Sequence, residues 1–202
     1  MPCPGLQENV TIYKLSIDIC RSSRSSSPMN LLATSPSAST AFFQRSAGRW
    51  HSQRRYYTLN SDQEPLEAIS AIEVVFLPAE HPHLKPLAIA HHLSPDQAFQ
   101  CGAKVTWEST YTNVQRKPLK GETIFGIRDQ LMYRDRGFST TAPIVAEFEL
   151  IQPHVMRLQT AYDGASFEEE IKFVGDKHRT RQTITSRAGQ ELMIAQYLET
   201  RL

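Results

Sequence analysis

Short segments in which apolar and polar residues alternate follow one another along most of the chain. Successive side chains in a strand point to opposite faces, so this period of two indicates strands with one buried face. We predict ten strands, at about 50–59, 69–77, 102–112, 119–127, 131–136, 143–151, 154–162, 166–174, 178–186 and 191–198. Turn residues such as Asp163-Gly164 and Ala188-Gly189 separate them.

Two short helices interrupt this series of strands. Ser39 or Thr40 can cap a first helix that carries Ala41-Phe42-Phe43 and ends at Gly48. A second helix, Leu84–His92, is predicted in the Pro-rich connection before the third strand. Ten short strands with close connections predict an all-β fold, an antiparallel barrel, because closure removes the exposed edges of a sheet.

The first 40 residues differ in composition from the rest of the chain. They contain nine serines between Ser16 and Ser39, and Glu8 and Asp18 are their only acidic residues. Such a segment cannot bury enough apolar surface to fold alone, and a Ser-rich, acid-poor start is typical of organelle transit peptides. We therefore predict a targeting or disordered leader at residues 1–40 and a barrel domain at residues 41–202.

Composition narrows the range of partners. The formal net charge is +1 and no apolar run approaches the ~18 residues of a membrane span, so neither nucleic acid nor a membrane is expected as a partner. Cys3, Cys20 and Cys101 are too scattered for a disulfide framework or a zinc site. His81, His83, His91 and His92 lie in the Pro-rich connection without a matching ligand set, and no metal is predicted.

Alternation places several chemically distinctive side chains on the predicted inner face. Glu169 shares a face with Phe167, Ile171 and Phe173, where an unpaired carboxylate would be costly. Other inward candidates are the pair Arg179 and Arg181, the pair Trp50 and Arg54, and Trp107 with Val105. Aromatic rings, a glutamate and arginines suit a flat, conjugated ligand that carries carboxylates. The alternative is structural, namely a cross-strand Glu–Arg pair and a tryptophan in the core.

Three blocks of sequence carry recognisable motifs. Phe42-Phe43 followed by Ser46–Arg54 is similar to FF…SxGxWxSQR, Cys101–Glu108 to CGxxVxWE, and Glu168–Arg181 to EERxWF…NxRxRxS. In this order and spacing the blocks resemble the S-type (CpeS/CpcS) phycobiliprotein chromophore lyases. The resemblance runs from about residue 41 to the C-terminus and includes the ending Tyr197–Arg201.

The resemblance implies a lipocalin-like barrel of ten antiparallel strands with an N-terminal helix, usually a homodimer. It also implies an enzyme that attaches a phycobilin to a cysteine of a phycobiliprotein, commonly on the β-subunit, with the bilin as substrate and no permanent cofactor. Glu169, with Glu168 as the alternative, would hold pyrrole nitrogens, and Arg179, Arg181 and Arg54 the propionates. Trp50 and Trp107 would form walls, and Cys101 is expected to be a packed residue that does not hold the bilin.

Three positions depart from the family pattern. Tyr57 stands where some relatives carry histidine, while Glu170 and Lys172 replace an arginine and an aromatic residue. We expect these positions beside the pocket, where they would bear on which bilin is bound. The leader suggests a eukaryotic plastid, such as that of a cryptophyte or red alga, and hence phycoerythrobilin. Two other hypotheses remain open: a bilin carrier or chaperone without transferase activity, and a barrel for fatty acids or other hydrophobic ligands.

Overall fold

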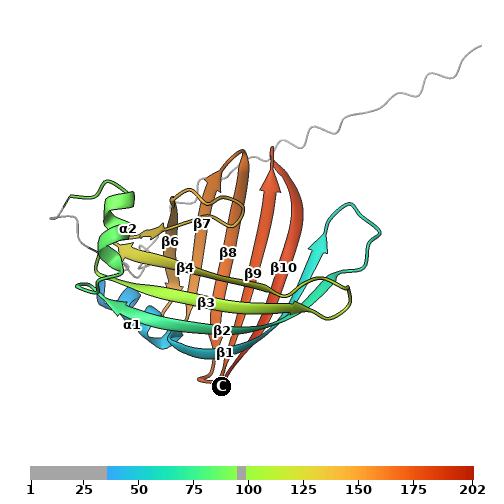
Figure 1. The fold of residues 1–202 in the computed structure, drawn as a ribbon, viewed down its shortest axis with the longest axis horizontal. Helices are drawn as coiled ribbons and strands as arrows, with labels where there is room; N and C mark the ends of the chain where they lie inside the picture. Colours follow the sequence, from blue (N-terminus) through green and yellow to red (C-terminus); the bar gives the residue numbers. More distant parts are fainter. Residues whose placement is uncertain (1–35, 95–98) are drawn as a thin grey trace, which may run out of the picture. The chain divides into compact units, whose positions relative to one another are not determined.

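Ten antiparallel strands close into a barrel in the computed structural model, which describes residues 36–94 and 99–202 (Figure 1). Each strand pairs with the next along the chain, and β1 pairs with β10 to close the sheet. The strands are β1 Gly48–Thr58, β2 Leu66–Pro78, β3 Cys101–Tyr111, β4 Leu119–Arg128, β5 Leu131–Arg134, β6 Ile144–Gln152, β7 Val155–Tyr162, β8 Ala165–Val174, β9 His178–Arg187 and β10 Gln190–Arg201.

The predicted all-β fold is confirmed. Every predicted strand is present, and its ends lie within three residues of the predicted ones. The hairpins at Asp163-Gly164 and Ala188-Gly189 have positive φ at both residues, the geometry that a tight two-residue turn requires. Register shifts occur at the end of β6 and near the start of β10, so they do not reverse the alternation along the middle of these strands.

The first helix, α1 Pro36–Ser46, begins earlier than predicted. Ser39 and Thr40 therefore lie within the helix and do not cap it, and the last five residues assigned to the leader belong to α1. The fixed φ of a proline suits the first turn of a helix, so Pro36 is compatible with its place in α1. The remainder of the predicted leader lies outside the described residues.

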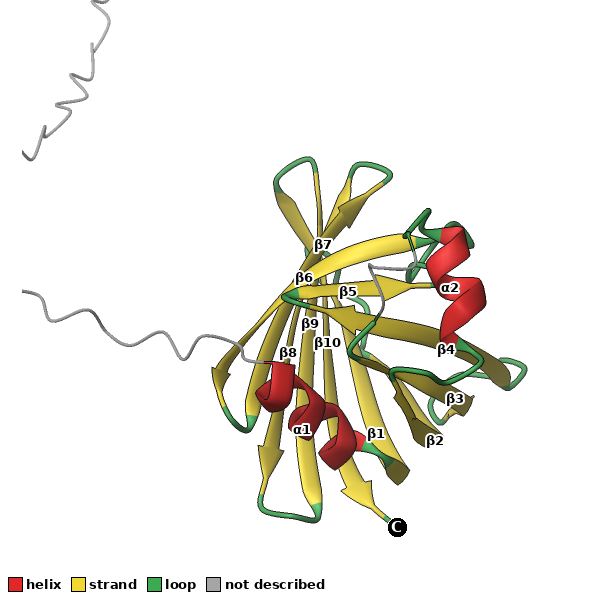
Figure 2. Ribbon diagram, turned by 90° about the vertical axis from the view of Figure 1, so that its left-hand side faces the viewer, coloured by secondary structure: helices red, strands yellow, loops and turns green. Residues whose placement is uncertain are grey.

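One end of the barrel is closed by α1, which lies across the strands there (Figure 2). Phe42 and Phe43 are 2% and 3% exposed and pack among inward-facing side chains that include Phe148 and Phe173. Burial of two phenylalanines removes a large apolar area from water, and this holds the helix in place. This end of the interior is therefore a packed core.

The second helix, α2 Leu84–Ala90, lies on the outside of the barrel against β4 (Figure 2). Leu84 and Leu87 join Leu77, Phe99 and Tyr133 in a second apolar cluster, separate from the inner one. The helix is two residues shorter than predicted, and His91 follows it as the C-cap. Among the described residues, no helix is long and apolar enough to cross a membrane.

Candidate functional site

Two ion pairs lie on the inner face of the barrel, at different depths. Arg181 on β9 pairs with Glu169 on β8, and Arg179 on β9 pairs with Glu199 on β10. The two arginines are two residues apart on β9, as the sequence predicts, and each pairs with a carboxylate on a neighbouring strand. The sequence did not identify Glu199, although it lies directly opposite Arg179 in the register of β9 and β10.

The Arg179–Glu199 pair belongs to the packed end of the barrel. Its Nε–Oε2 distance is 2.5 Å, and the two side chains are only 7% and 0% exposed. The Arg179 guanidinium stacks on Trp50 at 4.4 Å from the ring, and Arg201 stacks on the same ring at 4.2 Å. Trp50 is itself fully buried and donates from Nε1 to the carbonyl oxygen of Ser46 at 3.0 Å. Trp50 and Arg179, both predicted to contact the ligand, therefore lie in the packing beside α1.

The Glu169–Arg181 pair lies where solvent reaches the inner face. Arg181 is 24% exposed along its side chain, whereas Glu169 is 2% exposed. The Tyr197 ring lies beside the pair, 5.1 Å from Cζ of Arg181 and 5.3 Å from Cζ of Arg54. Burial raises the pKa of the Tyr197 hydroxyl and the positive charges of Arg181 and Arg54 oppose this shift, so the phenol stays protonated near neutral pH. Glu169, Arg181, Arg54 and Tyr197 thus form one polar group, which we call the inner polar group.

Several other inward-facing side chains are only partly buried. Trp107, Val105, Phe125 and Ile171 pack against the inner apolar cluster, yet solvent reaches each of them. Trp107 lies against Gly121 on β4, where an added Cβ would come within 2.4 Å of the indole. A part-buried tryptophan facing inward is available to a ligand in a way that the fully buried Trp50 is not. Solvent therefore reaches part of the inner face away from the fully buried Trp50.

Several predicted positions face outward instead. Glu168, the alternative to Glu169, is exposed on the outer face of β8 because it is adjacent to an inward-facing residue. Glu170 lies on the same outer face and pairs with Arg157 at 3.5 Å, and Lys172 is exposed there too. Tyr57 alternates with the inward-facing Tyr56 on β1. The expectation that Tyr57, Glu170 and Lys172 adjoin the pocket is wrong.

Arg134 on β5 is a second inner-face residue that the sequence argument missed. Its Nε is buried with no hydrogen-bond partner in the described structure, and its Cζ lies 4.7 Å from the centre of the Phe138 ring. Burial, reinforced by the charge of Arg181, lowers the pKa of its guanidinium to about 10. The alternation of β5 could have identified Arg134, because it is two residues from the buried Met132 and therefore lies on the same face of the strand.

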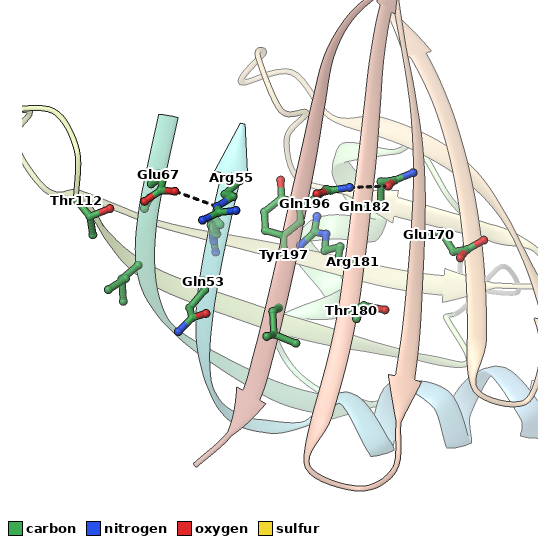
Figure 3. A pocket seen from close by; sticks show the side chains of 14 residues that line it. Gln53, Arg55, Glu67, Thr112, Glu170, Thr180, Arg181, Gln182, Gln196 and Tyr197 are labelled. Atoms are coloured by element: carbon green, nitrogen blue, oxygen red, sulfur yellow. Dashed lines mark hydrogen bonds and ion pairs between the residues drawn. The ribbon is translucent and has the colours of Figure 1, made fainter. Parts of the chain in front are cut away.

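A groove of about 770 Å³ runs along β1, β2, β9 and β10 (Figure 3). Consecutive residues of these strands line it, and their exposed members, such as Gln53, Gln182 and Gln196, point outward. Figure 3 shows Gln196 and Gln182 paired across β10 and β9, and Arg55 paired with Glu67 across β1 and β2. The groove is therefore an outer-surface feature, and only Arg54, Arg181 and Tyr197 connect it with the inner polar group.

Cys101 and His91 both lie in packed surroundings. Cys101 is fully buried, and burial raises its pKa, so it is not a thiolate near neutral pH. His91 contacts the carbonyl oxygen of Arg134 through Nε2 at 2.9 Å and packs edge-on against Tyr133. The described residues contain no group of three side chains able to hold a metal ion.

Fold and site together define a class of protein: a closed antiparallel barrel, plugged at one end by a helix, with charged and aromatic side chains on its inner face. The CpeS family model, described as "CpeS-like protein", matches residues 39–202. This range covers the whole barrel and most of α1.

Named relatives agree with this match. A Nostoc sp. protein named "Putative phycocyanobilin lyase CpcS 2" is 48% identical over 161 residues, which is 80% of this chain and 89% of that protein. "Chromophore lyase CpcS/CpeS 2" of Trichodesmium erythraeum is 33% identical over 73% of this chain and 79% of its own length. The solved structure of the S-type phycobiliprotein lyase CPES from Guillardia theta has a TM-score of 0.66 at 22% identity, covering 80% of this chain and 90% of that one, and shows the same fold.

The chain belongs to the CpeS-like family of chromophore lyases. The resemblance stated from three sequence motifs is thereby confirmed.

Proposed function

We propose that this lyase binds a phycobilin inside the barrel and attaches it to a cysteine on the β-subunit of a phycobiliprotein. The observation that carries the proposal is the inner polar group, in which the buried Glu169 and the part-exposed Arg181 lie beside Tyr197 and Arg54. A linear tetrapyrrole offers pyrrole N–H donors, two propionate carboxylates and flat apolar faces. The accessible half of the interior has a counterpart for each of these.

The proposed roles follow from what each side chain contacts. Glu169 is acceptor-only when ionised and can receive hydrogen bonds from pyrrole nitrogens, while Arg181 pairs with Glu169 and fixes its position, and Arg54 offers donors to a propionate. Trp107 provides a partly exposed aromatic surface against which the chromophore can pack. Trp50 and Arg179 support this arrangement from the packed end without facing the accessible interior.

The chemical step needs no nucleophile from this chain. The thiol of the acceptor cysteine adds across the ethylidene double bond of the bilin: a carbon–sulfur bond forms, the thiol proton ends on ring carbon, and no group leaves. The lyase contributes by holding one conformer of the bilin and presenting one face, which raises both the rate and the selectivity of a reaction that thiols undergo unaided.

Two bilins are candidates for the substrate. The Ser-rich leader is the basis for phycoerythrobilin, since it suggests a plastid of the cryptophyte or red-algal kind. The name of the Nostoc relative instead favours phycocyanobilin. Because Tyr57, Glu170 and Lys172 face outward, they provide no argument for either one.

The test compares both bilins and a matched pair of variants. The protein is mixed with phycoerythrobilin or phycocyanobilin, the absorbance change is titrated, and an apo β-subunit is then added to measure covalent product. We expect Glu169→Gln to weaken binding and transfer, and Glu168→Gln, one residue away but on the outer face, to leave both unchanged. No absorbance change with either bilin, and a product mixture equal to that without protein, would overturn the proposal.

The same measurements separate the other hypotheses. A carrier without transferase activity would bind the bilin but leave the rate and the mixture of thiol adducts unchanged. A fatty-acid barrel would release the bilin when a long-chain fatty acid is added. A fatty acid has no N–H donor for a buried glutamate acceptor, so we expect a fatty acid to compete poorly with the bilin.

We further propose that the protein is a homodimer located in a plastid. The dimer is supported by the resemblance to the S-type lyases, and the location by the composition of residues 1–40. Light scattering of the purified barrel tests the first, and the location of a fluorescent fusion to residues 1–40 tests the second. A monomer at micromolar concentration, or a cytosolic fusion, would contradict the respective proposal.

A further inference from the structure

Strands β1, β5 and β9 direct four arginines to the inner face, and these differ in their partners. Arg179 and Arg181 each form an ion pair with a glutamate. Arg54 and Arg134 form no ion pair in the described part of the chain, and the Nε of Arg54 donates only to the Ser52 hydroxyl, at 3.3 Å. Of these four, Arg54 and Arg134 have no carboxylate partner among the described residues. Arg201 on β10 also lies without one, over Trp50, but it donates to the carbonyl oxygens of Ala47 and Arg45.

The unpaired charge of Arg134 is in a less favourable environment than that of Arg54. Its Nε is buried without an acceptor, and the adjacent carboxylate of Asp135 already accepts from Thr123 Oγ1 at 2.6 Å, from Ile124 N at 3.1 Å and from Arg136 at 3.2 Å. The lowered pKa of Arg134 reflects burial and the nearby charge of Arg181. A buried cation without a partner is costly, and such a cost is commonly retained where a ligand supplies the missing charge.

The surroundings of Arg134 match one end of a linear tetrapyrrole. Its guanidinium lies over Phe138, which lies 5.2 Å from Phe167, and Phe167 stacks on Tyr162 at 4.9 Å. Arg181 lies near enough for its charge to lower the pKa of Arg134, and Arg181 shares the Tyr197 ring with Arg54. Arg54 and Arg134 thus approach the Glu169–Arg181 pair from different strands, β1 and β5, and an aromatic cluster lies next to Arg134.

We propose that Arg134 is a bilin-binding residue that pairs with one propionate of the chromophore, while Arg54 pairs with the other. This inference rests on the proposed function and refines it. Each propionate then meets a guanidinium that has no carboxylate partner among the described residues. Arg181, already neutralised by Glu169, orients the carboxylate acceptor for the pyrrole nitrogens.

The experiment uses phycocyanobilin and its dimethyl ester, which lacks both negative charges, as probes. Absorbance titrations are run on the wild-type protein, on Arg134→Met, on Arg134→Gln in case the methionine variant folds poorly, and on the control Arg136→Met. Arg136 is two residues away and exposed, and it pairs with Asp135. Thermal unfolding of each apo-protein is measured in parallel.

We expect the Arg134 variants to bind the free acid about 10- to 100-fold more weakly, the effect of one charge-assisted hydrogen bond, and the dimethyl ester as well as wild type does. The apo-protein should melt at an equal or higher temperature, because an unpaired buried charge has been removed. A purely structural role for Arg134 predicts the opposite: a lower melting temperature and equal losses for acid and ester.

Wild-type affinity for the free acid in both Arg134 variants, or equal losses for acid and ester, would overturn the assignment of Arg134 alone. If the wild-type protein binds neither probe and does not bind phycoerythrobilin either, the proposed function fails together with this inference. The two failures are therefore distinguishable in one set of titrations.

Discussion

The two buried carboxylates among the described residues of the barrel show that the surroundings of a glutamate determine its role. Glu169 and Glu199 each meet an arginine of β9, but the arginine beside Glu169 is reached by solvent and the one beside Glu199 is not. A fully buried ion pair contributes little net stability, because desolvation offsets the attraction, yet breaking it leaves an uncompensated charge. The Arg179–Glu199 pair is therefore structural, and the Glu169–Arg181 pair remains available to a ligand.

We predict that Glu199→Gln lowers the free energy of unfolding by about 3–5 kcal/mol, because Arg179 stays buried without its counter-charge. Urea denaturation measures the change, with Glu191→Gln, exposed on the same strand, as the control. Replacing both partners, as in Arg179→Met with Glu199→Leu, should recover most of the loss. An unchanged midpoint for Glu199→Gln would show that the pair does not hold the packed end together.

At the scale of elements, α1 decides which half of the barrel is accessible. Its phenylalanines fill one end, and Arg201 on β10 fixes its C-terminal end. The two Nη atoms of Arg201 donate to the carbonyl oxygens of Ala47 and Arg45, both at 2.5 Å. Carbonyl groups at the end of a helix lack partners within the helix, so a positively charged donor from the last strand is favourable there.

We expect Arg201→Met to lower the free energy of unfolding by about 1.5–3 kcal/mol, the range for hydrogen bonds to a charged group. The same substitution at Arg49, which is exposed on β1, is the control and should change stability by less than about 0.5 kcal/mol. Thermal and urea unfolding measure both. If the two variants are equally stable, α1 is held by its phenylalanines alone.

At the scale of the whole barrel, two features define the interior: the sheet is closed, and α1 fills one end of it. Closing the sheet pairs the edges of β1 and β10, and α1 fills one end of the barrel. Under the proposed function, a ligand adds its contacts in the remaining, charged part of the interior. A ligand that binds only the folded barrel stabilises it in proportion to the logarithm of its concentration over its Kd.

We predict that phycobilin at a hundred times its Kd adds about 2.7 kcal/mol to the stability of the barrel and raises its Tm by roughly 5–10 °C. Scanning calorimetry with and without bilin checks this. The rise should be much smaller in Glu169→Gln at the same bilin concentration. A Tm that does not respond to bilin in the wild-type protein would show that the folded barrel does not bind it.

The order and type of the strands, their turns and the face on which Glu169, Arg181, Arg54 and Trp107 lie were predictable from the sequence. Each depends on local properties, because alternation sorts side chains wherever no bulge intervenes, and the two register shifts lie near strand ends. For the same reason Glu168 could be recognised as the weaker candidate, since it alternates with Glu169.

Which charged residues pair, and how far along the barrel interior each side chain lies, were decided only by the tertiary structure. That Arg179 meets Glu199, that Trp50 is buried beside α1, and that Arg134 lies unpaired near Arg181 depend on which strands become neighbours and on where α1 plugs the barrel. Alternation tells which face a side chain is on but not how far along the interior it lies or which charge it meets there. Those features arise from contacts between residues far apart in the chain, which a pattern of near neighbours cannot encode.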